Sequence, residues 1–129
     1  MSVAITAIYA SVLSVVYVVL SYRVAKCRMR FAVGLGTAHN VELERAVRIH
    51  GNFAEYVPLA LLLLAFYEVG GGAWWAVHTA GAWLVVARLL HAVGLTRSSG
   101  RSTGRFAGVV MTWTLLLALA VGNLVLSLR

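Results

Sequence analysis

The stretch ERAVRIHGNFAEYVPL, residues 44–59, decides the fold, because it places charged side chains inside an apolar segment that continues to Phe66. Arg48, Asn52 and Glu55 are spaced at i, i+4 and i+7, which puts all three on one face of a helix. The segments on either side of this stretch are mostly apolar and are suited to the hydrocarbon core of a membrane. A membrane helix that carries a cation, an amide and an anion in one stripe is expected to have a functional reason for them.

The composition predicts an integral membrane protein. Of 129 residues, 61% are hydrophobic and 12% are charged, with a mean hydropathy of +0.88, whereas soluble domains carry about 25% charged residues. The net charge of +7 comes from basic residues between long apolar runs. This pattern is typical of cytoplasmic loops and argues against a nucleic-acid partner. The single cysteine, Cys27, allows no internal disulfide and is expected to be a passive thiol.

Four segments are long enough to span a bilayer, which needs about 20 apolar residues. We predict an all-α four-transmembrane-helix bundle over residues 3–25, 42–68, 73–93 and 105–128, forming one domain over 1–129. The first segment lacks the basic start and the cleavage site of a signal peptide, so we expect it to be retained. The basic loops around residues 30–41 and 94–104 are predicted to be cytoplasmic, with both termini outside.

Two charges inside these spans are predicted to share one depth. Glu55 precedes Glu68 by 13 residues, or about 20 Å, which puts it about 10 Å below the inner surface of a core about 30 Å thick. Arg88 lies at a similar level in the third helix. Because an isolated ion at the bilayer centre costs about 2.5–3.5 kcal/mol, we expect the two to pair or to face a wet cavity. Pro58 is predicted to kink the second helix beside Glu55.

The polar cluster at this depth has more positive than negative groups. Interhelical hydrogen bonding is the structural explanation, but one pair, contributing about 0.6–2 kcal/mol, would suffice for it. The surplus of arginine instead favours an anionic ligand, because guanidinium binds carboxylates through two hydrogen bonds. His91, one turn from Arg88, is expected to reach the same ligand, whereas His50 lies off the stripe and Arg45 is interpreted as a headgroup-facing side chain. No metal site is expected, because the histidines have no metal-binding motif.

The pattern Arg48-x-x-x-Asn52-x-x-Glu55-Tyr56-x-Pro58 resembles the second-helix signature of the MAPEG family, the membrane-associated proteins in eicosanoid and glutathione metabolism. The variant present here looks like the bacterial branch, and the similarity covers residues 42–126. The resemblance implies a homotrimer, here in a bacterial inner membrane. It also implies that glutathione binds as a co-substrate between neighbouring subunits near the cytoplasmic leaflet.

The resemblance also implies roles for individual residues. Residues matching those that hold glutathione are Arg48, Asn52, Glu55 and Tyr56, and Arg88 matches a further contact. Glutathione has two carboxylates and one ammonium, so two arginines and one glutamate complement it in sign. His91 and Leu95 stand where family enzymes often carry tyrosines.

Activation of the glutathione thiol is assigned by the resemblance to an arginine near the start of the fourth helix, for which the candidates are Arg101 and Arg105. A cation beside the sulfur lowers the pKa of the thiol and favours the thiolate. A basic residue of the first loop, Arg28 or Arg30, is expected to assist.

Three functions compete. The first is a membrane glutathione transferase or peroxidase acting on apolar electrophiles from the bilayer. The second is a lipid-binding or scaffold member of the same fold without catalysis. The third is a small proton-coupled multidrug exporter, which is disfavoured because the first helix has no carboxylate and Glu55 has arginines nearby.

Overall fold

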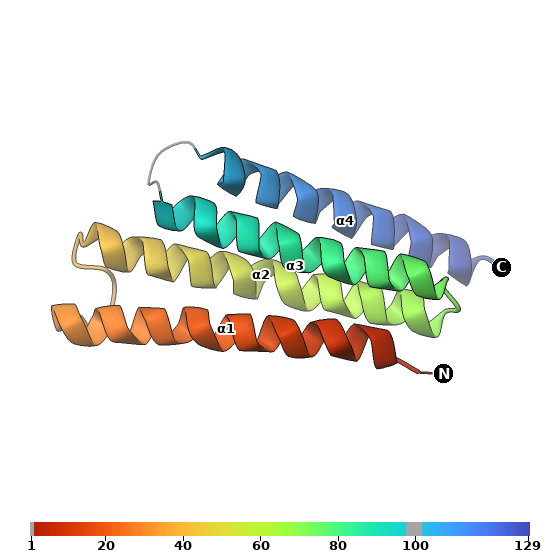
Figure 1. Ribbon diagram of the computed structural model, residues 1–129, viewed down its shortest axis with the longest axis horizontal. Coiled ribbons are helices and arrows are strands. Elements are labelled where there is room, and N and C mark those ends of the chain that lie inside the picture. Colours follow the sequence, from red (N-terminus) through yellow and green to blue (C-terminus); the bar gives the residue numbers. More distant parts are fainter. Residues whose placement is uncertain (1, 98–101) are drawn as a thin grey trace.

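The computed structural model describes residues 2–97 and 102–129, which fold into four long helices lying side by side (Figure 1). They are α1 (Ala4–Phe31), α2 (Val41–Val69), α3 (Trp74–Arg97) and α4 (Thr103–Ser127). All four are long and apolar enough to cross a membrane. The predicted all-α, four-helix membrane fold is therefore confirmed.

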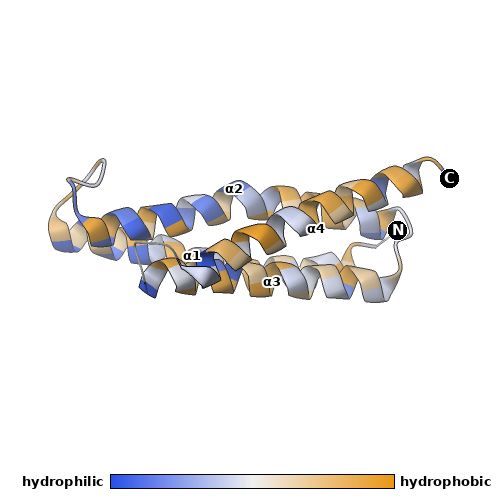
Figure 2. Ribbon diagram, turned by 90° about the horizontal axis from the view of Figure 1, so that it is seen from above, coloured by the Kyte–Doolittle hydropathy of each residue, from blue (hydrophilic) through white to orange (hydrophobic). Residues whose placement is uncertain are grey.

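Helices α2 and α3 form the centre of the bundle, where they pack on each other, and α1 and α4 pack against them. The chain termini lie at one end of the bundle, and the α1–α2 connection lies at the other (Figure 1). Hydrophilic residues gather in the first half of α2, at the end away from the termini (Figure 2). The fold thus places the polar stripe of residues 44–59 at one end of an otherwise apolar bundle.

Two helices, α1 and α3, extend more than two residues beyond their predicted ends. α1 continues six residues beyond residue 25 to Phe31 and ends where Ala32 adopts a left-handed backbone, with φ of 53°. Arg28 and Arg30 therefore lie in the last turn of a helix, where basic side chains can extend past the hydrocarbon. α3 continues through Gly94 to Arg97, because Gly94 is packed against the start of α4. Pro58 lies inside a continuous α2.

At the opposite end of the bundle, where the chain termini lie, the Glu68 carboxylate links α2 to the start of α1. Glu68, at the end of α2, accepts hydrogen bonds from the backbone N–H groups of Ile5 and Thr6 at 2.9 and 2.8 Å, and one from Thr6 Oγ1 at 2.6 Å. The first N–H groups of a helix have no partner within the helix and favour a negative charge. Glu68 therefore caps α1 and fastens it to α2.

Replacing Glu68 by glutamine is expected to lower the free energy of unfolding in detergent by about 1–2 kcal/mol, because the charged cap is lost. The matched control is Glu42→Gln, which removes the carboxylate that pairs with Arg30 at 3.4 Å on the exposed surface. Exposed pairs contribute about 0–1 kcal/mol. Equal losses in the two variants, measured by denaturant titration, would show that Glu68 is no more than a surface charge.

Candidate functional site

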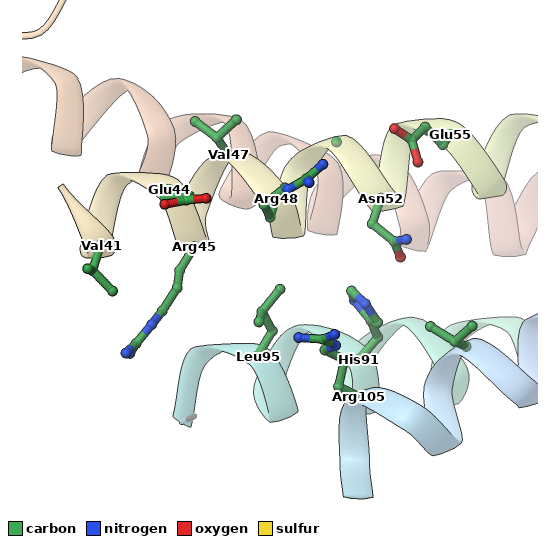
Figure 3. Close-up of a pocket in the computed structure, with 12 residues that line it drawn as sticks. Val41, Glu44, Arg45, Val47, Arg48, Asn52, Glu55, His91, Leu95 and Arg105 are labelled. Carbon is green, nitrogen blue, oxygen red and sulfur yellow. The ribbon is translucent and has the colours of Figure 1, made fainter. Parts of the chain in front are cut away.

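The polar stripe of α2 faces a cavity of about 700 Å³ between α2, the end of α3 and the start of α4. Figure 3 shows the stripe opposite the side chains of His91 and Leu95 from α3 and of Arg105 from α4. The cavity is lined by Val41, Glu44, Arg45, Val47, Arg48, Gly51, Asn52, Glu55, His91, Leu95, Arg105 and Val109. Of the predicted cluster, the structure thus brings Arg48, Asn52, Glu55 and His91 together at one cavity.

The helical repeat explains why α2 supplies most of this wall. Its residues at positions 41, 44, 45, 48, 51, 52 and 55 recur every three or four residues and so share one face. The start of the stripe is fixed by the N-cap Asn40, whose side chain accepts a hydrogen bond from Leu43 N at 2.9 Å. The charged side chains of this face are therefore held on a regular, capped helix.

The cavity wall carries a surplus of positive charge. Arg45, Arg48 and Arg105 face it together with Glu44 and Glu55, so three cations stand against two anions when His91 is counted as neutral. In the described part of the chain, the one salt bridge joins Arg30 to Glu42 and lies outside the cavity. The cavity charges are therefore not neutralised by salt bridges among themselves.

Arg88 lies beside the cavity, not on its wall. It is 2% exposed, and its Nη1 donates to Asn52 Oδ1 at 2.8 Å while Nη2 donates to Gly108 O at 3.1 Å. Of the two predicted alternatives, pairing of Arg88 with Glu55 is wrong, since Asn52 is the acceptor on α2. Glu55 is exposed and lines the cavity, which was the other alternative. The Arg88 guanidinium carbon lies 5.7 Å from the centre of the Tyr56 ring.

Tyr56 is also outside the cavity wall. Its ring packs under Arg88, and its hydroxyl accepts a hydrogen bond from Trp113 Nε1 at 3.2 Å. The structure thus places Tyr56 in the contact between α2 and α4. Its role in holding glutathione stays a prediction.

The two basic candidates at the end of α1 lie elsewhere. Arg28 Nη1 donates to the carbonyls of Val33, Gly34 and Gly36, at 3.1–3.3 Å, and so holds the loop after α1. Arg30 pairs with Glu42 on the surface. Of the two candidates for thiol activation, Arg105 lines the cavity and Arg101 lies outside the described residues.

The cavity wall also carries Glu44, which has no role predicted from the sequence, and Arg45, which is interpreted from the sequence as a headgroup-facing side chain. They precede Arg48 by four and three residues, so the same helical spacing that groups Arg48 with Asn52 already included them. Arg45 Nε is buried with no hydrogen-bond partner in the described structure, which argues against a purely headgroup-facing role. His91 lines the cavity, and its contact with a ligand stays a prediction. His50 lies off the stripe and packs against Tyr17, with ring centres 4.9 Å apart.

Gly108 allows the close contact of α3 and α4 beside the cavity. A Cβ atom there would lie 2.5 Å from Ala87 O and 2.8 Å from His91 N. Gly51, on the cavity face of α2, has open space around it, because a Cβ atom at that position would have no neighbour within 4 Å. A methyl group therefore fits at Gly51 but not at Gly108.

Gly108→Ala is expected to lower the free energy of unfolding by about 1–2 kcal/mol, because backbone must shift to admit the methyl group. Gly51→Ala, the matched control in a helix interior, is expected to raise it by about 0.5–1 kcal/mol. Denaturant titration of both variants measures the difference. A Gly108→Ala protein as stable as Gly51→Ala would contradict the close packing of α3 and α4.

Comparison with known proteins finds a protein family and two relatives that match across all four helices. The family model described as "MAPEG family" matches residues 6–125. Two Escherichia coli proteins, both called inner membrane protein YecN, from strain K12 and from strain O6:H1, are each 36% identical to this chain over 120 residues. The matched region is 93% of this chain and 90% of either relative.

Proposed function

This chain belongs to the MAPEG family, and we propose that it binds glutathione and activates its thiol for reaction with apolar electrophiles taken from the membrane. The reaction is a conjugation or a peroxide reduction. In conjugation, the thiolate sulfur forms a bond to the electrophile, and a leaving group departs with its electron pair. The family membership supports the reaction class, and the cavity supports the ligand.

The observation that carries the proposal is the charge of the cavity wall. Glutathione has two carboxylates and one ammonium, so it bears a net negative charge, and the wall offers three arginines and two glutamates. Guanidinium groups bind carboxylates through paired hydrogen bonds, and a glutamate pairs with an ammonium. A cavity of about 700 Å³ is within the usual size of small-molecule sites.

The roles divide along the wall. Arg48 and Arg45 are assigned to the carboxylates, Glu55 to the ammonium, and the Asn52 amide to a peptide carbonyl or carboxylate. Arg105 reaches the cavity from α4, opposite the stripe (Figure 3). We assign to it the stabilisation of the thiolate, because a cation in a site of low dielectric lowers the pKa of a nearby thiol.

The proposed assembly is a homotrimer in the inner membrane, with both basic loops facing the cytoplasm. The name of the relatives supports the location, and the resemblance supports the trimer. Many large apolar side chains on the outer faces of the helices are exposed, including Val15, Val18 and Leu117. Lipid and neighbouring subunits would cover them.

Arg48→Ala is expected to weaken glutathione binding at least about tenfold, since a charge-assisted carboxylate contact is lost. Isothermal titration calorimetry of the purified protein in detergent measures the effect. Arg97→Ala removes an equal charge outside the cavity and is expected to bind glutathione as the wild type does. If neither the wild type nor either variant bound glutathione, the proposed function would be refuted.

Leu95 and His91 favour a second candidate, a non-catalytic member that binds an anionic ligand. Both line the cavity, and the family resemblance implies tyrosines at these two places in many enzymes of the family. This candidate predicts binding of glutathione or of an anionic lipid without thiolate formation. Ultraviolet absorbance of the bound thiolate near neutral pH distinguishes the two functions, because only the enzyme should produce it.

A further inference from the structure

The Arg88 guanidinium joins three helices. It comes from α3, and it donates one hydrogen bond to the Asn52 side chain on α2 and one to the Gly108 carbonyl on α4. It is 2% exposed and is not part of the cavity wall. The planar guanidinium presents its donors in a fixed fork and so can hold two acceptors at a set separation, whereas an ammonium on a flexible stem does not.

On α2, this contact sets the orientation of the Asn52 amide. Arginine donates hydrogen bonds and accepts none, so the amide oxygen must face Arg88 and the amide nitrogen must turn away. Asn52 lines the cavity, and no hydrogen bond from its Nδ2 is made to the described residues. Asn52 therefore offers N–H donors to the cavity, which suits a carboxylate or carbonyl of a ligand.

On α4, the contact holds the turn that carries Arg105. Gly108 follows Arg105 by one turn, and its carbonyl also accepts a hydrogen bond from Thr112 Oγ1 at 2.7 Å. A Cβ atom on Gly94 of α3 would overlap the backbone nitrogen of Arg105, so the two helices touch there as well. The Arg88 hydrogen bond therefore secures the start of α4 against α3, at the place from which Arg105 reaches the cavity.

We infer that Arg88 is a positioning residue, which orients Asn52 and Arg105 toward the ligand without touching the ligand itself. Its effect on glutathione binding rests on the proposed function. The positioning is a property of the ligand-free protein and is tested separately. Arg88 thus differs from Arg48, which faces the cavity directly.

The first test uses the ligand-free protein. In nitrogen-labelled protein in micelles, Arg88→Lys is expected to shift the NMR signals of the Asn52 side-chain amide and of Arg105 Nε. The conservative control Arg30→Lys, outside the cavity, is expected to leave both signals in place. Unchanged Asn52 and Arg105 signals in Arg88→Lys would overturn the inference, whether or not the protein binds glutathione.

The second test separates positioning from charge. Arg88→Lys keeps the cation but loses the planar fork of donors. Both Arg88→Lys and Arg88→Met are therefore expected to weaken glutathione binding about tenfold or more and to raise the pKa of the bound thiol. A lysine variant that behaves as the wild type, beside an impaired methionine variant, would show that Arg88 acts through its charge and would overturn the inference. A wild type that binds no glutathione would refute the proposed function alone.

A third measurement uses the wild-type protein and so does not depend on the folding of an Arg88 variant. When wild-type protein is titrated with glutathione, a positioning residue predicts a smaller shift of the Arg88 guanidinium signal than of the Arg48 signal. A shift of Arg88 equal to or larger than that of Arg48 would show direct contact and would contradict the inference.

Discussion

Arg105→Met is expected to reduce turnover of glutathione with an activated aryl halide by about 100-fold or more. Loss of one preorganised group that stabilises developing negative charge typically has an effect of this size. Arg105 faces the cavity from α4, opposite the residues assigned to the carboxylates, so its loss should affect the thiolate more than the affinity. The measurement is steady-state kinetics together with the ultraviolet absorbance of the bound thiolate across pH.

The control for Arg105 is Arg97→Met. Arg97 is an exposed arginine at the end of α3 that does not line the cavity. The substitution removes the same charge from the same end of the bundle, so it is expected to leave turnover and the thiol pKa near the wild-type values. Equal losses in the two variants would mean that the general positive field, not Arg105 itself, activates the thiol.

Asn52→Leu is expected to lower the free energy of unfolding by about 3 kcal/mol, because it removes an acceptor from a cation that is 2% exposed. The second acceptor, Gly108 O, is shared with Thr112 and cannot replace it fully. Denaturant titration in detergent gives the difference. The matched control is Asn123→Leu. The Asn123 amide donates to the neutral carbonyls of Leu63 and Leu119, so this substitution is expected to lower the free energy of unfolding by about 1 kcal/mol.

A second substitution checks the cause of that loss. Asn52→Leu combined with Arg88→Met removes the buried charge together with its acceptor, and replacing both partners by apolar groups is often close to neutral. The double variant is therefore expected to recover most of the stability lost in Asn52→Leu. A double variant that is less stable than Asn52→Leu would show that the buried cation was not the source of the loss.

The fold was largely predictable because each span has a continuous apolar run and because the breaks contain glycine. The helix ends were less so. Lys26, Arg28 and Arg30 looked like a loop, yet basic side chains can continue a helix beyond the hydrocarbon, and α1 ends only at Phe31. Gly94 looked like a helix break, but tertiary contact with α4 keeps it helical.

The α2 side of the cavity followed from helical spacing alone, since Arg48, Asn52 and Glu55 share one face. The hydrogen-bond partner of Arg88 on α2 could not be predicted from helical spacing. Depth arguments place Glu55 and Arg88 at one level but carry no information on rotation about the helix axes, which decides that Asn52 is the acceptor. The same spacing rule also places Glu44 and Arg45 on this face. Glu44 was given no role and Arg45 was assigned to the headgroups, because charges near a membrane surface are commonly explained by contact with headgroups.

The central claim is that an anionic thiol peptide occupies the cavity between α2, α3 and α4. A cryo-electron microscopy structure of the protein with glutathione tests it most directly. The account predicts density for the tripeptide along the α2 stripe, with a carboxylate at Arg48 and the sulfur beside Arg105. Glutathione bound elsewhere, or an empty cavity at saturating glutathione, would contradict it.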